Sequence, residues 1–259
     1  MDTHPAAIRL VDVGAEAALI AGGGRAILLQ LANPAIGHAV ARHSDFAAHP
    51  LRRLQHTLTY VYALVYGTPE QVDRVRTMVN RTHARVRSVD GESPSYDATD
   101  PDLQLWVAAT LYDTAMTLRA RLIGPLSESD LDSIYQDYAV IGTALQVAEG
   151  AWPSDRAAFA VYWAHQLEGL SVDETVWRTS DDLLHPHTGP WWLRAAMPLA
   201  RLVTAGLLPA GVRSAYRLPW GPRRERRFRL ALGTIATVNR MLPKRAREWP
   251  KNFLLRDLD

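Results

Sequence analysis

Signals for helix starts recur along this chain and restrict its fold more than any other feature of the sequence. In "YGTPEQV", Gly67 ends one helix. Thr68 then begins the next helix as its N-cap, with Pro69 at the first helical position and Gln71 completing a capping box. Apolar residues recur at intervals of three or four, and no segment alternates with period two over the length of a strand. The sequence predicts an all-α protein.

The same signals place the other helices. Asp100 and Pro101 predict the start of a long helix that ends before the breaker Gly124-Pro125, and Ser127 predicts a helix that reaches about Glu149. Ser44 or Asp45 in "HSDF" is the expected cap of a helix near 51. Further helices are expected at about 51–66, 156–168, 172–184, 191–207 and 223–241, the last of which is the final helix.

Length and composition indicate one soluble globular domain. The chain has 259 residues, with 47% hydrophobic and 22% charged residues, which suffices for a large core. We therefore expect residues 1–259 to form a single multi-helix domain. The absence of cysteine excludes disulfides, zinc–thiolate sites, iron–sulfur clusters, and haem that is ligated by a thiolate or attached through Cys-x-x-Cys-His. A metal would need other ligands, such as histidine.

Charge and hydropathy bear on location and partners. The start "MDTHPAAIRL" lacks the pattern of a secretory signal, and no run of 18 apolar residues is free of charge, so we expect a cytoplasmic protein. Residues 212–251 carry ten arginines and two lysines against two glutamates, a local charge of +10 in a chain whose net charge is +2. This basic helical segment is either a solvated face or a contact for an anionic membrane surface or nucleic acid.

Three consecutive glycines, Gly22 to Gly24, precede a predicted helix in "AGGGRAILLQ". Glycines before a helix can cradle a phosphate. The spacing matches neither the dinucleotide fingerprint nor the P-loop, however. The favoured interpretation is a tight turn into a buried helix.

His83 lies on the apolar stripe of its predicted helix, because it follows Val79 and precedes Val86 at helical spacing. On the preceding helix Arg53, His56 and Thr57 stand at i, i+3 and i+4 and share a face. A link this short predicts an antiparallel helical hairpin whose polar groups face each other across a pocket. From the residues alone, His83 is a metal ligand, a base or a hydrogen-bonded core residue.

The segments that carry these groups resemble a known family. They are "GGGRAILLQLANPAIGHAVARHSDFAAHPLRRLQHTLTYVYALVYGTPEQVDRVRTMVNRTHARV" and "YDATDPDLQLWVAATLYDT". They resemble the oxygenase family that contains bacterial latex-clearing protein (rubber oxygenase) and the fungal endoplasmic-reticulum oxygenase of mycophenolic acid biosynthesis. The resemblance covers about residues 20–245 and is dense over 22–114. It implies an all-helical domain that binds haem b non-covalently.

The resemblance also implies roles for single residues. His83 matches the proximal iron ligand in the family pattern Arg-x-x-His-x-x-x-Arg, and Arg87 matches the arginine that follows it. Arg53 and Thr57 match polar residues of the distal oxygen site. His56 stands where the rubber enzyme has a lysine able to cap the iron, so it is either a donor to dioxygen or a second iron ligand.

Three positions depart from the family pattern. Asn80 replaces an arginine of the rubber-enzyme motif, Ser88 replaces a glycine present in many relatives, and Ala108 in "WVAATL" replaces a histidine present in many relatives. Ala108 therefore removes a group that could orient haem or a partner.

The expected function is that of a haem b-dependent oxygenase that cleaves a C=C bond of a lipophilic unsaturated, for example isoprenoid, substrate with dioxygen. The basic segment 212–251 is suited to peripheral membrane contact, whereas nucleic acid is not expected as a partner. One alternative is a non-enzymatic haem carrier, sensor or electron-transfer protein with both His56 and His83 on iron. Another is a haem-free helical protein that binds lipid or nucleic acid. The sequence does not specify the oligomeric state.

Overall fold

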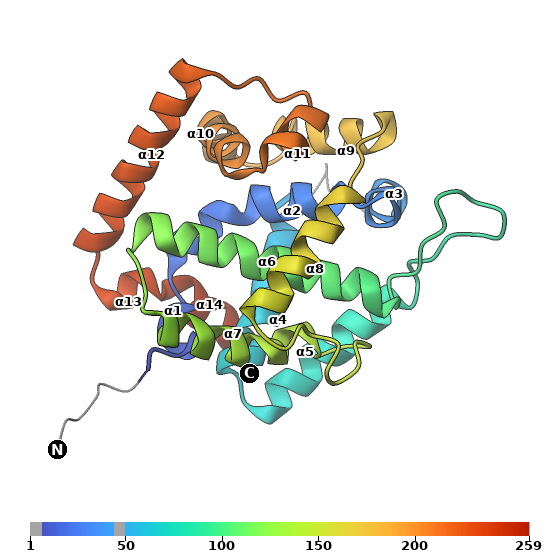
Figure 1. Ribbon diagram of the computed structural model, residues 1–259, viewed down its shortest axis with the longest axis horizontal. Helices are drawn as coiled ribbons and strands as arrows, with labels where there is room; N and C mark the ends of the chain where they lie inside the picture. Colours follow the sequence, from blue (N-terminus) through green and yellow to red (C-terminus); the bar gives the residue numbers. More distant parts are fainter. Residues whose placement is uncertain (1–6, 44–49, 259) are drawn as a thin grey trace.

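The computed structural model describes residues 7–43 and 50–258, and this part of the chain is built from helices without a named strand (Figure 1). The all-α prediction is confirmed. The elements are α1 (Leu10–Val13), the 3-10 helix η1 (Ala17–Gly22), α2 (Gly23–Leu31), α3 (Pro34–His43), α4 (Pro50–Tyr66), α5 (Pro69–His83), α6 (Pro101–Leu122), α7 (Glu128–Gly142), α8 (Arg156–Glu168), α9 (Glu174–Leu184), α10 (Trp191–Leu207), α11 (Ala210–Ala215), α12 (Pro222–Met241), α13 (Lys244–Arg247) and α14 (Trp249–Arg256).

The helix starts predicted from capping residues are confirmed. The Thr68 hydroxyl accepts a hydrogen bond from the Gln71 backbone N–H, and the Gln71 side chain returns to the Thr68 backbone in a capping box. Asp100 caps α6, and Ser127 caps α7 in the same reciprocal way. The cap predicted at Ser44 or Asp45 lies outside the described residues. These caps satisfy N–H groups that have no partner inside the helix.

Two predictions about the helices are wrong. Helix α7 stops at Gly142 instead of continuing to about Glu149. Gly142 packs against the Trp152 ring, where no Cβ would fit, and the Gln146 backbone N–H donates to the Gln104 side chain, so the chain turns away here. Helix α12 is not the last helix, because α13 and α14 follow it. Pro243 and Pro250 divide this end of the chain into short segments, which hides its helical period.

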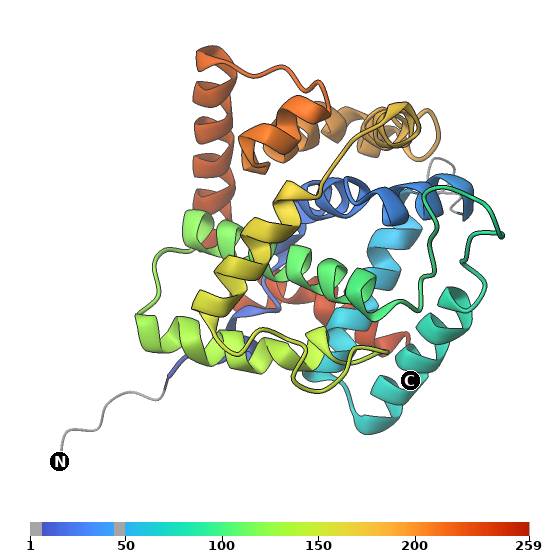
Figure 2. The same cartoon turned by 45° about the vertical axis from the view of Figure 1, so that its right-hand side comes forward.

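Helix α6 runs through the middle of the molecule, with α2, α7 and α12 packed around it (Figures 1 and 2). Its Trp106 is fully buried, donates its indole N–H to the Leu29 carbonyl, and stacks on Trp163. Through Trp106, helix α6 therefore fixes the positions of α2 and α8 in the core. Further along, Tyr112 joins an aromatic cluster with Tyr135. This core fixes the helix face that lines the site described below.

Two of the three glycines let helices approach closely, and the helix that follows them, α2, is largely buried, as the favoured interpretation predicted. A Cβ on Gly22 or Gly24 would overlap the buried side chains of Thr114 and Thr204, respectively. A Cβ on Gly23, in contrast, would lie 3.5 Å from Leu54 Cδ1, an ordinary contact. The glycines thus bring the start of α2 against α6 and α10.

This difference predicts opposite outcomes for neighbouring substitutions. We expect Gly24→Ala to lower the free energy of unfolding by about 1–3 kcal/mol, because Thr204 is buried and cannot move aside. Gly23→Ala should be neutral or slightly stabilising, because alanine favours the helix. Urea denaturation of both variants measures this, and Gly24→Ala combined with Thr204→Ala should recover part of the loss. Equal effects of the two single changes would contradict the packing role.

Helices α4 and α5 pack on each other after a two-residue link, which confirms the predicted hairpin (Figure 2). In the described part of the chain no single helix is long and apolar enough to cross a membrane. The bent pair Ala17–Leu31 and Pro34–His43 passes the same test of length and composition, at an angle of 106°. Most of α2 is buried in the core, as expected of a core helix that passes such a test.

Candidate functional site

A cavity of about 490 Å³ lies beside the α4–α5 hairpin and is closed by α3, α6 and the end of α7. Its volume falls within the roughly 300–1,000 Å³ typical of small-molecule and cofactor sites. Polar side chains come mainly from α4 and α5, whereas α6 and α7 contribute aliphatic groups. The cavity therefore has one polar and one apolar side.

The polar side brings together four of the five site residues predicted from the sequence. Arg53, His56 and Thr57 line the cavity from the first turns of α4, and His83 lines it from the last turn of α5. The start of α4 meets the end of α5 because the two helices run antiparallel. The predicted face-to-face arrangement of these polar groups is therefore present.

His83 is half-buried, and its Nδ1 atom is buried without a hydrogen-bond partner among the described residues. Burial lowers the pKa of His83 below the ordinary 6.5, and the positive charge of Arg53 lowers it further. The imidazole is thus held in its neutral form, which is the form that ligates metals. A buried polar atom without a partner marks a place where a group absent from the protein chain can bind.

Positive charge dominates the polar side. Burial lowers the pKa of Arg53 to about 10, so the guanidinium remains charged at neutral pH. Arg52 also lines the cavity, and among the described residues no aspartate or glutamate lines it. Tyr60, one turn after Thr57, has a buried hydroxyl without a partner among the described residues, and burial raises its pKa. The cavity is suited to a neutral or anionic ligand.

The opposite side of the cavity is apolar. Leu103, Val107 and Leu111 recur at intervals of four residues on α6, and Ile141 and Leu145 come from the end of α7 and the turn after it. This spacing puts three aliphatic groups on one face of α6. A hydrocarbon chain or the apolar face of a ring system would bury its surface here.

Arg87, the fifth predicted site residue, is exposed and lies outside the cavity lining. It forms an isolated antiparallel bridge with Asp97, and the neighbouring Ala98 N–H donates to the Val86 carbonyl at 2.9 Å. This pairing puts Val86 and Ala98 against the cavity. Arg87 thus belongs to the backbone pairing that positions two lining residues, although its side chain does not line the cavity. A contact between Arg87 and a cofactor stays a prediction.

The residues that depart from the family pattern hold parts of the same wall. Asn80 accepts a hydrogen bond of 2.9 Å from Gln146, which also bonds to Gln104 on α6. Ser88 accepts one of 3.0 Å from the Tyr96 N–H. Ala108 lines the cavity. A histidine at position 108 would add a further imidazole to those of His43, His56 and His83, and the alanine leaves that space open.

Several lining residues were missed in the sequence. Gln30 donates to Thr110 at 3.0 Å, and Tyr96 contacts His43, whose Nε2 lies 3.0 Å from the Tyr96 hydroxyl. Tyr60 could have been found, because it lies seven residues after Arg53 on the same helical face. Gln30 and Tyr96 gave no such signal, since their place depends on how distant segments pack.

The fold and the site define a class: all-helical proteins with a histidine-bearing, largely apolar internal cavity that fits a small molecule or cofactor. The profile of the family "ER-bound oxygenase mpaB/B'/Rubber oxygenase, catalytic domain" matches residues 11–237. The chain belongs to this family of oxygenase catalytic domains, as its motifs indicated.

Two relatives match most of the chain without adding a function. The chain is 37% identical over 225 residues to uncharacterized proteins of Mycobacterium bovis (Mb2261) and Mycobacterium tuberculosis (Rv2237). Each match covers 85% of this chain and 88% of the relative. No solved structure matches the chain.

The lowered pKa of His83 predicts a pH dependence of stability. In the unfolded chain the imidazole takes up a proton near pH 6.5, whereas in the folded chain it does so only at lower pH. Unfolding therefore binds a proton in this window, and the contribution of His83 to stability falls as the pH drops below about 6.5. Urea titrations at pH 5.5 and 7.5 should show a smaller loss for His83→Gln than for the wild type. An equal loss in both proteins would contradict the lowered pKa.

Proposed function

We propose that this protein is a haem b-dependent oxygenase that cleaves a C=C bond of a lipophilic unsaturated substrate with dioxygen. The observation that carries the proposal is His83, which lines the cavity and is partly buried. Burial lowers its pKa, and its Nδ1 atom has no hydrogen-bond partner among the described residues. Membership of an oxygenase family agrees with it.

The residues present fit haem b better than a bare metal ion. Among the described residues, no three His, Asp or Glu side chains gather as a metal site. A protein-bound ion such as Zn²⁺ needs three or four such ligands. Iron in a porphyrin needs only an axial ligand from the protein, and His83 supplies a neutral imidazole. Arg52 suits a propionate of haem, and the aliphatic face of α6 suits its ring.

In this proposal the polar side of the cavity binds dioxygen and the apolar side binds the substrate. Haem b, when bound, supplies an iron centre for dioxygen chemistry. Arg53 and Thr57 hold hydrogen-bond donors on the polar side, where burial strengthens their stabilisation of developing negative charge. His56 can donate to the same region. Ile141 and Leu145, from the end of α7 and the turn after it, would contact the hydrocarbon chain and exclude water.

Location and partners are part of the same proposal. We place the protein in the cytoplasm with peripheral contact to a membrane, where lipophilic substrates reside. The exposed arginines of α12, among them Arg223, Arg226 and Arg227, suit an anionic lipid surface.

The test of the oxygenase proposal is product formation from labelled dioxygen. The haem-loaded protein is incubated with unsaturated isoprenoid and fatty substrates under ¹⁸O₂, and carbonyl products are detected by mass spectrometry. We expect ¹⁸O-labelled aldehydes or ketones that depend on haem and dioxygen. Haem-loaded protein that yields no labelled carbonyl product from any of these substrates would refute the proposed reaction.

A second candidate function rests on His56, which lines the same cavity as His83. If both imidazoles held the iron, the protein would be a haem carrier, sensor or electron-transfer module. Low-spin spectra that persist on reduction and exclude carbon monoxide would support this candidate over the oxygenase.

A further inference from the structure

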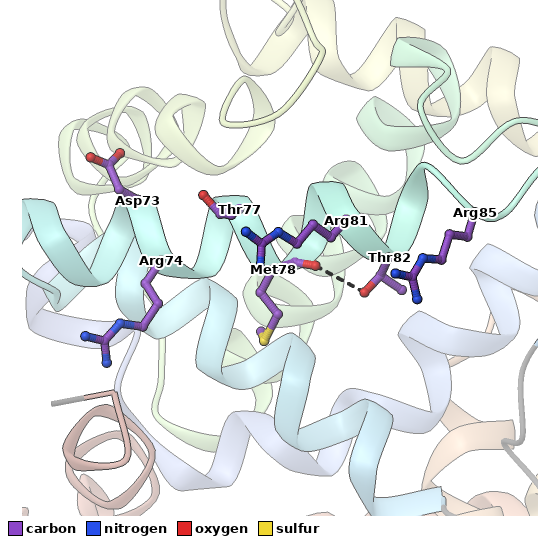
Figure 3. A pocket seen from close by; sticks show the side chains of 7 residues that line it. All are labelled: Asp73, Arg74, Thr77, Met78, Arg81, Thr82 and Arg85. Atoms are coloured by element: carbon purple, nitrogen blue, oxygen red, sulfur yellow. Dashed lines mark hydrogen bonds between the residues drawn. The ribbon is translucent and has the colours of Figure 1, made fainter.

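A second hollow of about 580 Å³ follows the solvent side of α5, and its lining is rich in arginine (Figure 3). We call it the α5 groove; it is lined by Asp73, Arg74, Thr77, Met78, Arg81, Thr82 and Arg85. Figure 3 shows the side chains of Arg81, Thr82 and Arg85 gathered on one face of this segment, toward its C-terminal end. The α5 groove is thus cationic at the end nearer His83.

Arg81 and Arg85 have no carboxylate partner among the described residues. The ion pairs of the described chain include neither of them. Asp73, the one acidic residue in the lining, precedes Arg81 by eight residues, which is about 12 Å along a helix. Arg81 lies in the last turn of α5 and Arg85 in the turn that follows its end, and both line the groove, so both can reach one anionic group. Arg74 already donates to the Leu258 carbonyl.

The α5 groove and the cavity share two lining residues. Met78 and Thr82 belong to both, and His83 follows Thr82 directly. Met78 presents an adaptable apolar side chain, which suits contact with a hydrocarbon chain. Met78 and Thr82 therefore connect the groove to the cavity. If the charged end of a ligand lies at Arg81 and Arg85, its apolar chain can extend past them toward the apolar side of the cavity.

We propose that the α5 groove binds the anionic head group of an amphipathic substrate through Arg81 and Arg85, with the apolar chain directed past Met78 into the cavity. The substrate class is then an unsaturated aliphatic carboxylate or phosphate. A guanidinium pair recognises either group through charge-assisted hydrogen bonds. The inference deepens the proposed function, and it concerns binding that needs neither haem nor dioxygen.

The test compares two probes that differ only in head group, cis-9-tetradecenoate and cis-9-tetradecenol, below their aggregation concentrations. Binding is measured by calorimetry with the full chain as purified. We expect the carboxylate to bind about tenfold or more tightly than the alcohol, since a guanidinium forms charge-assisted hydrogen bonds with a carboxylate but only weaker ones with a neutral hydroxyl. The advantage should shrink as salt is raised, because both arginines are exposed.

Paired variants locate the effect. Arg81→Gln with Arg85→Gln should remove most of the carboxylate advantage and leave alcohol binding unchanged. The matched control, Arg226→Gln with Arg227→Gln, makes the same change in net charge on exposed positions of α12 and should retain the advantage. Far-UV circular dichroism monitors folding, and the wild-type probe and salt series does not depend on a variant. Equal affinity of the wild type for both probes, or an equal loss for both probes in the α5 variant, would overturn the inference.

Haem propionates are another source of carboxylate, and a second titration separates them. Haem b and its dimethyl ester are added to the haem-free wild type and to the α5 variant. We expect the variant to bind both forms as the wild type does. If the variant instead loses affinity for haem b alone and keeps its preference for tetradecenoate, Arg81 and Arg85 serve the cofactor and the substrate inference is wrong. A protein that binds no haem but discriminates the two probes would refute the proposed function and keep this inference.

Discussion

Replacing His83 by alanine is expected to abolish stable haem binding. The variant removes a cavity-lining imidazole whose pKa is lowered by burial and by the charge of Arg53. Without an axial ligand, only apolar contacts and ion pairs hold the porphyrin. Haem titration followed by the Soret band should give near-stoichiometric binding for the wild type and at least a hundredfold weaker binding for His83→Ala.

Two controls separate ligation from loss of fold. His165→Ala changes an exposed histidine on α8 and should bind haem as the wild type does. Added imidazole should restore a Soret band to His83→Ala, because the small ligand can occupy the vacated space. An unchanged haem affinity in His83→Ala would remove this residue from the site.

Trp106→Ala is expected to be the most destabilising single change in the core. The side chain is fully buried, stacks on Trp163 at 5.1 Å between ring centroids, and donates to the Leu29 carbonyl at 3.2 Å. Truncation of a buried tryptophan costs about 3–5 kcal/mol in the free energy of unfolding. Because α6 supplies much of the apolar wall of the cavity, ligand binding should weaken as well.

Denaturant titration followed by circular dichroism measures the effect. Trp191→Ala, on the exposed start of α10, is the matched control, because Trp191 retains 75% of its exposure in the folded chain. It should change the free energy of unfolding by less than about 0.5 kcal/mol. A similar loss in the free energy of unfolding for both variants would mean that Trp106 contributes no more to stability than an exposed tryptophan.

The helices could be predicted largely because their ends are encoded locally. Thr68 and Asp100 cap their helices through their own side chains, so a few neighbouring residues suffice. The end of α7 could not be predicted, because Gly142 is fixed by the distant Trp152 ring and the turn after it by Gln104. Where a helix ends through tertiary contacts, the local pattern carries no signal.

The candidate site, too, could be predicted only in part from local sequence. The shared cavity could be predicted from the spacing of Arg53, His56 and Thr57 and from the apolar stripe around His83. The short link between the two helices requires them to pack side by side. The aliphatic wall from α6 and α7 could not be predicted, because aliphatic residues that line a cavity recur at the same helical spacing as those in the core. The outward position of Arg87 follows from its bridge to Asp97, which no helical pattern predicts.

The cationic character of the site could be foreseen only in part. The sequence gives many arginines in and around α5, but their partners depend on the fold. Arg74 donates to the Leu258 carbonyl at the far end of the chain, whereas Arg81 and Arg85 have no ion-pair partner among the described residues. Two of these arginines thus form the charged end of the α5 groove because the C-terminal segment occupies the third.

The most direct test of the central claim is the absorption spectrum of the purified wild type in the ferric, ferrous and ferrous-plus-carbon-monoxide states. The account predicts a Soret band in the ferric protein and a shifted band when carbon monoxide is added to the ferrous protein, because in the proposal His83 would hold the iron and the cavity would admit a diatomic ligand. The absence of a Soret band after reconstitution with haem would contradict the account and leave a helical protein with a small-molecule cavity.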